Sequence, residues 1–228
     1  MLGFRSAWRA LPLRITFIRH GVSELTGKPV LVGHTDSPLS DLGRLQAARL
    51  GERFAGRPFD ALWASPLLRT RDTAAAIGET IGHAAVLDRR LMEVNLGDLE
   101  GAHFTQLQNG PGSWRDRWQK NPGRVRFPKG ENLQEVANRS WQVLEHLYER
   151  HPNGHVIIVS HMFTISTMLC RVLKLKVSQF RTFAVDPASV TTVQLDNGGL
   201  RLMLLNDTSH LDGLDGEKLR TGALPPRK

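Results

Sequence analysis

Short apolar runs are spaced along the chain between longer segments of mixed polarity. Each run is bounded by Gly, Pro or charged residues and predicts a buried strand. Four such runs cover residues 15–18, 60–64, 84–87 and 155–160. The last, His-Val-Ile-Ile-Val-Ser, is an unbroken β-branched run, which suits a strand covered on both faces. Residues 190–195 and 200–205 predict two further strands, joined by the hairpin signal Asn197-Gly198.

Segments with helical periodicity alternate with these strands. Four helices are expected over about residues 41–54, 66–81, 131–150 and 163–173. Ser40 predicts the N-cap of the first helix. Ser65-Pro66 predicts the start of the second, because Ser caps well and Pro fits the first helical position. The side chains expected to face inward are Leu42, Leu45, Leu50 and Phe54 in the first helix and Leu133, Val136, Leu144, Leu147 and Tyr148 in the third.

Strands that alternate with helices indicate an α/β fold. We expect a three-layer αβα sandwich with a mostly parallel central sheet, an antiparallel edge strand and an inserted cap segment over residues 98–130. One domain is predicted for residues 1–228, with an N-terminal extension over 1–13 and a flexible tail over 212–228. Trp114 and Trp118 lie four residues apart and predict a packing face of the cap.

Side chains suited to chemistry follow each predicted core strand. Arg19 and His20 follow the first strand, and Arg69 lies in the opening turn of the helix after the second. Glu93 follows the third strand, and His161 follows the strongest one. Ligands of open α/β sheets bind outside the carboxyl ends of the strands, so we expect these five side chains to meet there. Two His, two Arg and one Glu describe a site for a phosphoryl group.

The chemistry of phosphoryl transfer fits this set of residues. Arg supplies bidentate donors that match phosphate oxygens, and a neutral imidazole can act as a nucleophile. A protonated carboxyl can donate its proton to the leaving oxygen and then accept one from water. Since two Arg and a second His carry the charge, we predict no metal and no cofactor.

The charge balance adds a class of partner. Thirty Lys and Arg residues against twenty-two Asp and Glu give a net charge of +8, with basic clusters in residues 1–19 and 103–129. Such an excess favours anionic partners, namely phosphorylated metabolites, nucleic acid or an acidic surface. No nucleic-acid reader motif is present, so a small phosphorylated substrate ranks first and nucleic acid last.

Two further features bear on where the protein works. Cys170 is the only cysteine and cannot form an intrachain disulfide, which favours a reducing compartment, the cytoplasm. No run of 18 or more apolar residues occurs, so we expect no membrane span. No pattern decides the oligomeric state, and a homodimer stays open.

Several motifs in one order support a more specific interpretation. They are Arg19-His20-Gly21-Val22-Ser23, Gly33-His34-Thr35-Asp36-Ser37-Pro38-Leu39-Ser40 with Gly43, Ser65-Pro66-Leu67-Leu68-Arg69-Thr70 with Thr73-Ala74, Glu93 with Gly97 and Glu100-Gly101, Gly130-Glu131-Asn132, Val159-Ser160-His161 and Asn206-Asp207-Thr208-Ser209-His210-Leu211. With this order and spacing, about residues 14–210 resemble the histidine phosphatase superfamily, in the branch of cofactor-dependent phosphoglycerate mutases and related phosphatases.

The resemblance implies roles for the residues at the strand ends. His20 would be the phosphorylated nucleophile, and Arg19, Arg69 and His161 would form the phosphate pocket. Glu93 would be the proton donor. From the residues alone, Glu93 could instead pair with Arg89 or Arg90, and Glu100 is the next candidate for the acid. The resemblance also implies that the ligand pocket is lined by Ser23, Gly33, Arg71 and Met162.

This chain departs from the family pattern at two of the pocket positions. Thr26 stands where relatives usually carry Asn, and its hydroxyl can still donate a hydrogen bond to a phosphate oxygen. Met162 stands where Gly usually follows the second His, and we expect it to narrow the mouth of the pocket. Both departures are expected to affect the substrate range more than the chemistry.

The same resemblance helps to decide between a phosphatase and a phosphoglycerate mutase. The glycolytic mutases carry a Gly-Leu-Asn-Lys run and a paired Arg-Arg, and this chain has neither. We therefore expect a phosphomonoester hydrolase that acts through a phosphohistidine on a small anionic phosphometabolite. A cofactor-dependent phosphoglycerate mutase is the first alternative. A non-catalytic phospholigand-binding module is the second, although binding alone needs neither His20 nor Glu93.

Overall fold

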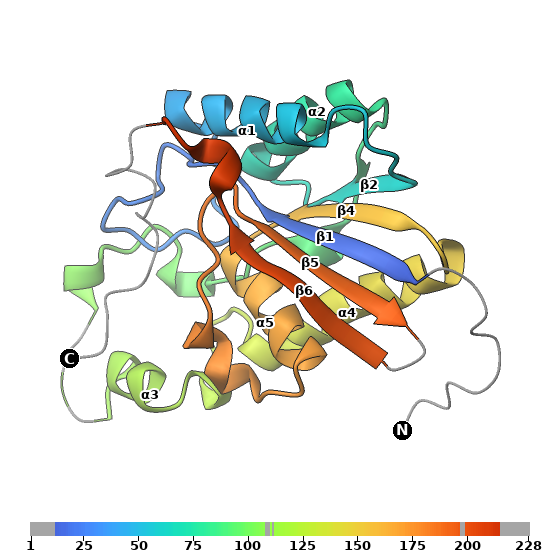
Figure 1. Cartoon of the computed structure of the whole chain (residues 1–228). Helices are drawn as coiled ribbons and strands as arrows, with labels where there is room; N and C mark the ends of the chain where they lie inside the picture. The colour runs from blue at the N-terminus through green and yellow to red at the C-terminus, as the bar shows by residue number, and fades with distance from the viewer. Residues whose placement is uncertain (1–11, 108–109, 111, 197–198, 215–228) are drawn as a thin grey trace.

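The computed structural model describes residues 12–107, 110, 112–196 and 199–214. These residues form a six-stranded sheet in the order β3-β2-β4-β1-β5-β6 (Figure 1). The strands are β1 (Leu13–Arg19), β2 (Ala61–Ala64), β3 (Val86–Leu87), β4 (His155–Ser160), β5 (Val190–Asp196) and β6 (Gly199–Asp207). Strands β3, β2, β4 and β1 are parallel, whereas β5 pairs antiparallel with β1 and with β6. The predicted α/β fold with a mostly parallel sheet is confirmed.

Helices cover both faces of this sheet. Helices α1 (Asp41–Phe54) and α2 (Leu68–Ile81) lie on one face, and α4 (Leu133–Arg150) and α5 (Met162–Val172) lie on the other (Figure 1). Alternate residues of β4 serve the two layers: Val156 and Ile158 pack in the core under α4 and α5, and Ile157 and Val159 in the core under α1 and α2. This burial on both faces explains the continuous apolar run of β4.

Helix α1 begins as predicted, but it faces the sheet differently. The Ser40 hydroxyl accepts from the Gly43 N–H at 3.1 Å and caps the helix. Gly43 lies so close to Val22 that a Cβ would come within 1.9 Å of the Val22 carbonyl oxygen. This contact sets the rotation of α1, because residue 45 then lies about 200° around the helix. The prediction that Leu45 faces inward is therefore wrong, and its side chain is exposed.

Helix α2 begins later than predicted, and Ser65 is not its cap. The Ser65 N–H donates to the Val159 carbonyl at 3.1 Å, so the chain continues to pair with β4 through this residue. The N-cap residue is Leu67, and the Asp36 carboxylate accepts from the first helical N–H, that of Leu68, at 2.6 Å. A side chain distant in sequence thus caps α2.

Three other element predictions need correction. Helix α4 begins at Leu133 because Asn132 and Glu135 form a capping box there. The third predicted strand shortens to Val86–Leu87, and both residues are exposed at the sheet edge. Strand β1 begins at Leu13, the last residue of the predicted N-terminal extension. The proposed hairpin turn at 197–198, residues 1–11 and residues 215–228 lie outside the described residues.

The segment predicted as a cap contains short helices. They are η2 (Gly97–Leu99), η3 (Phe104–Gln106), α3 (Trp114–Lys120) and η4 (Pro122–Arg124). The rings of Trp114 and Trp118 stack with centroids 5.2 Å apart, and both contact Phe127. Trp118 also belongs to an apolar cluster with Val136 of α4 and Cys170 of α5. The two tryptophans therefore form a packing face, as predicted.

Candidate active site

His20 directly follows β1 and is held in one orientation. Its N–H donates to the Ser160 carbonyl at 3.0 Å, which extends the pairing of β1 with β4. Its ring Nδ1 lies 2.7 Å from the Gly21 carbonyl oxygen. Because a carbonyl only accepts, Nδ1 carries the proton and Nε2 keeps its lone pair. Burial, with the nearby Arg69 and Arg19 cations, holds the pKa of His20 well below its ordinary 6.5, so the ring is neutral.

The guanidinium of Arg69 lies against this lone pair. Its Nε is 3.3 Å from His20 Nε2. Its terminal nitrogens donate to the Gly33 carbonyl at 2.7 Å and to the Thr35 carbonyl at 2.9 Å. Arg69 is 2% exposed. Three of its five N–H groups are thus engaged, and the position of the cation is set by the loop that carries residues 33–35.

Glu100 holds that loop from the other side. Its carboxylate accepts from the N–H groups of Gly33, His34 and Thr35 at 3.1, 2.6 and 3.2 Å and from the Thr35 hydroxyl at 2.8 Å. Burial opposes ionisation, but these hydrogen bonds lower the pKa of Glu100 below its ordinary value. A carboxylate engaged in this way suits positioning, and the structure does not favour it as the fallback acid.

The pKa of Glu93 is shifted in the opposite direction to that of Glu100. Its carboxylate accepts from the N–H groups of Val94 at 2.9 Å and Phe163 at 3.2 Å. Burial nevertheless raises its pKa above the ordinary value, against the pull of these bonds and of Arg69 and Arg19. The alternative pairing with Arg89 or Arg90 is not seen: within the described residues Glu93 takes part in no ion pair, and Arg90 pairs with Asp88 at 2.6 Å.

Arg139 of α4 fixes the backbone that carries Glu93. Its guanidinium donates to the carbonyls of Arg90, Met92 and Glu93 at 2.7 to 2.9 Å. It also pairs with Glu131 at 2.7 Å. Helices α4 and α5 therefore both hold Glu93 in place, through Arg139 and through the Phe163 N–H.

Two donors of the predicted phosphate pocket have buried nitrogens without a hydrogen-bond partner in the described part of the chain. His161 caps α5, and its Nε2 lies 2.8 Å from the Ser65 hydroxyl while its Nδ1 is unpartnered. Arg19 donates through a terminal nitrogen to the Val185 carbonyl at 2.8 Å, and its Nε is unpartnered. Burial lowers the pKa of Arg19 to about 10, so it stays charged. The ring centroids of His20 and His161 are 5.2 Å apart.

The predicted pocket-lining residues divide into two groups. Ser23 and Thr26 contact each other, with hydroxyls 2.9 Å apart, beside the loop after His20. Gly33 supplies a carbonyl to Arg69, and Met162 directly follows His161. The Arg71 side chain is exposed on α2, and within the described residues no hydrogen bond joins it to the cluster. The structure therefore does not bring Arg71 together with the others.

A buried cluster of cations, neutral imidazoles and a carboxyl whose pKa burial raises suits an anion that exchanges protons. Residues 15–208 match the histidine phosphatase superfamily (branch 1). The chain belongs to the histidine phosphatase superfamily. The predicted resemblance is therefore confirmed, and the protein is an enzyme of this superfamily. Among the described residues, no group of three or more His, Cys, Asp or Glu side chains could hold a metal ion, and no helix could cross a membrane.

Named relatives of this superfamily enzyme include phosphatases and mutases. It is 31% identical over 200 residues to phosphoserine phosphatase 1 of Hydrogenobacter thermophilus, covering 87% of this chain and 94% of that protein. It is 29% identical over 205 residues to a probable phosphoglycerate mutase GpmB of Klebsiella pneumoniae, covering 88% and 95%. The structure of Bacillus stearothermophilus YhfR superposes with a TM-score of 0.82 at 25% identity, covering 88% and 100%.

Sequence reasoning missed the residues that support this cluster. The sequence presents Glu100 only as a second candidate for the acid, and it gives Arg139 and Ser65 no place in the site. Their partners lie far away in the chain: Glu100 is 67 residues from Gly33, and Ser65 is 96 residues from His161. A carboxylate in a Gly-flanked segment was the one visible signal, at Glu100.

Proposed function

We propose that this enzyme hydrolyses phosphomonoesters through a phosphohistidine on His20. The observation that carries the proposal is the protonation pattern of one ring. Nδ1–H donates to the Gly21 carbonyl, so Nε2 carries a lone pair, which accepts from the Arg69 Nε–H at 3.3 Å until a phosphate oxygen takes that donor. A buried neutral imidazole with this tautomer suits a nucleophile, because no proton has to leave before attack.

The first step forms one bond and breaks another. His20 Nε2 attacks phosphorus, the N–P bond forms, and the bond from phosphorus to the ester oxygen breaks. Glu93, whose protonated form burial favours by raising its pKa, gives a proton to the leaving oxygen. In the second step Glu93 accepts a proton from water, the oxygen of that water attacks phosphorus, and the N–P bond breaks to release inorganic phosphate and neutral His20.

Arg19, Arg69 and His161 would stabilise the transferring group. Charge spreads over the equatorial oxygens in such a transition state, so fixed donors contribute most of the catalysis. The Ser65 hydroxyl can donate to His161 Nε2, which leaves Nδ1–H as a donor for a phosphate oxygen. The unpartnered nitrogens of His161 and Arg19 support this role. This arrangement works without a metal ion or cofactor.

The substrate we propose is a small phosphorylated metabolite with a second negative group. The net charge of +8 favours anions, and the relative from Hydrogenobacter thermophilus is named for phosphoserine. Such a substrate also fits the cytoplasm, where we place the enzyme. A mutase activity is the second candidate, supported by the similarity to GpmB. The absent mutase motifs argue for hydrolysis, and the supported acid Glu93 argues against a binding module.

Trapping the intermediate tests the proposal. Wild-type enzyme is mixed with excess phosphoserine, quenched without acid and analysed by peptide mass spectrometry. Phosphate is expected on His20, and His20→Ala should lose both the label and turnover. Phosphate on another residue, or normal turnover by His20→Ala, contradicts the proposal. Conversion of 3-phosphoglycerate to 2-phosphoglycerate in the presence of 2,3-bisphosphoglycerate as primer would instead identify a mutase.

A further inference from the structure

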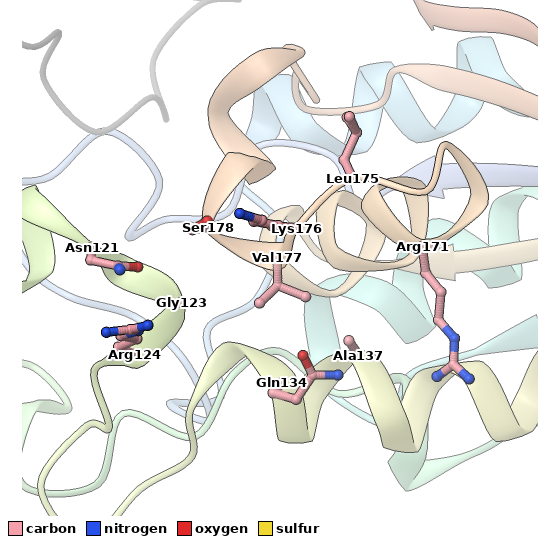
Figure 2. Close-up of a pocket in the computed structure, with 10 residues that line it drawn as sticks. All are labelled: Asn121, Gly123, Arg124, Gln134, Ala137, Arg171, Leu175, Lys176, Val177 and Ser178. Carbon is pink, nitrogen blue, oxygen red and sulfur yellow. The ribbon is translucent and has the colours of Figure 1, made fainter.

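A cavity of about 470 Å³ lies away from the His20 cluster, at the other end of α5. It opens to solvent and is lined by η4, the start of α4, the end of α5 and the segment that enters η5 (Val177–Thr182) (Figure 2). Helix α5 has 11 residues, so about 16 Å separate its ends. His161 caps one end and Arg171 lies at the other. The cavity and the candidate active site share no residue.

The charges around this cavity are of one sign. Arg124, Arg171 and Lys176 line it, from three different elements, and no Asp or Glu does. Its other lining residues are Asn121, Gly123, Gln134, Ala137, Leu175, Val177 and Ser178. In Figure 2 Arg124 and Arg171 lie on opposite sides of Val177, with Lys176 above it and Gln134 below.

These three cations differ from many others on the surface. Arg126 pairs with Glu135, and Lys120 pairs with Asp116 at 2.9 Å. Within the described part of the chain, Arg124, Arg171 and Lys176 take part in no ion pair. The Arg171 guanidinium lies 4.4 Å over the Trp141 ring, a contact that orients the cation without neutralising it. A bound anion would be attracted to all three cations.

The size and lining of the cavity define the class of anion. Its volume lies in the range of small-molecule sites, so it has room for a carbon skeleton. Ala137, Leu175 and Val177 offer apolar contact, and the amides of Asn121 and Gln134 and the Ser178 hydroxyl offer hydrogen bonds. We propose that this cavity is a second anion site, which binds a small organic molecule carrying at least two phosphate or carboxylate groups.

A titration with methylenediphosphonate, which phosphatases cannot hydrolyse, tests this site. The active site is first saturated with orthovanadate, so that the calorimeter records only the second site. At 0.15 M salt one saturable site is expected. Arg124→Ala and Lys176→Ala should each raise Kd about tenfold, because each removes one charge-assisted contact. Both side chains are exposed, so the variants are expected to fold with an unchanged Tm.

Arg117→Ala is the matched control. Arg117 is an exposed cation of α3 that does not line the cavity, and its removal lowers the net charge equally. Its Kd should change less than twofold. Absence of saturable binding, or equal weakening in the control, overturns the proposal. Tighter binding of hexaglutamate than of the diphosphonate, lost in Lys176→Ala, would also overturn it, because the cavity would then be a peptide site. Phosphatase activity does not enter this test.

Discussion

The carboxylate of Glu100 and the guanidinium of Arg69 hold opposite sides of one short loop. The N–H groups of Gly33, His34 and Thr35 donate to Glu100, and the carbonyls of Gly33 and Thr35 accept from Arg69. Arg69 in turn lies 3.3 Å from His20 Nε2. The loop has no spare space, since a Cβ on Gly33 would come within 2.5 Å of Glu100. The position of the Arg69 cation beside His20 therefore depends on a carboxylate that does not touch Arg69.

We predict that Glu100→Gln lowers kcat/KM about tenfold or more. The amide cannot accept from all three N–H groups, so the loop shifts and Arg69 shifts with it. Asp98→Asn, a carboxylate change at an exposed site nearby, should have little effect. A double-mutant cycle with Arg69→Ala should be non-additive if Glu100 acts through Arg69. If the two losses of kcat/KM are additive, or if only Tm falls, Glu100 stabilises the fold and does not act through Arg69.

Arg69→Ala should reduce kcat/KM about a hundredfold or more. Removal of one preorganised donor to developing charge typically costs about 3–4 kcal/mol. Arg19→Lys should also lose most activity, because a point charge does not replace the guanidinium fork. Steady-state kinetics with p-nitrophenyl phosphate measure both, with Arg49→Ala on α1 as the control. A loss smaller than about threefold at Arg69 would exclude it from the phosphate pocket.

Glu93→Gln should damage alkyl phosphate hydrolysis far more than the first turnover of p-nitrophenyl phosphate. An alkoxide leaves poorly without a proton, whereas p-nitrophenolate needs little help. Rapid-quench measurement of the phosphorylation step separates this effect from slow dephosphorylation. Equal sensitivity of that step for both leaving groups would show that Glu93 is not the acid.

The pH dependence of kcat/KM should identify Glu93 as the acid. Its pKa is raised above 4.5 by burial, so the protonated form persists above that pH and is lost as pH rises through the raised pKa. The kcat/KM of the wild type divided by that of Glu93→Gln, for one alkyl phosphate, should therefore fall with rising pH. Ionisation of the substrate affects both enzymes equally and cancels in this ratio. A ratio independent of pH would contradict this assignment.

Metal removal should leave activity intact. Two buried cations, Arg19 and Arg69, lie beside His20 and can carry the charge of the phosphoryl group. Hydrolysis of p-nitrophenyl phosphate is expected to continue in excess EDTA at the untreated rate. Loss of activity in EDTA that returns with Mg²⁺ would overturn this expectation.

His155 should make the fold sensitive to acid. Burial and the nearby Arg14 lower its pKa from 6.5 to about 4, and its Nε2 lies 2.8 Å from the Thr16 hydroxyl. A depressed pKa stabilises the fold above pH 6.5, and this contribution is lost as pH falls from 6.5 through about 4. Tm should drop less steeply across that window in His155→Gln than in wild type, with His83→Gln as the control. Parallel Tm curves would contradict the prediction.

Much of the scaffold could be predicted because its signals are local. The apolar run of β4, the Ser40 cap of α1 and the apolar period of α4 each depend on residues that are close together in the sequence. Strand ends also identified His20, Arg69, Glu93 and His161, because parallel strands bring their carboxyl ends to one edge. The order of the elements thus determined which side chains meet.

Only the tertiary structure decided which groups support the side chains at this edge of the sheet. Ser65 looked like a helix cap but bonds to His161, while Asp36 caps α2. Glu100 looked like an acid, yet three N–H groups from a loop 65 to 67 residues away hold it as a carboxylate. Local sequence determines where backbone hydrogen bonds repeat, whereas the ionisation of a buried group depends on whatever the fold packs against it.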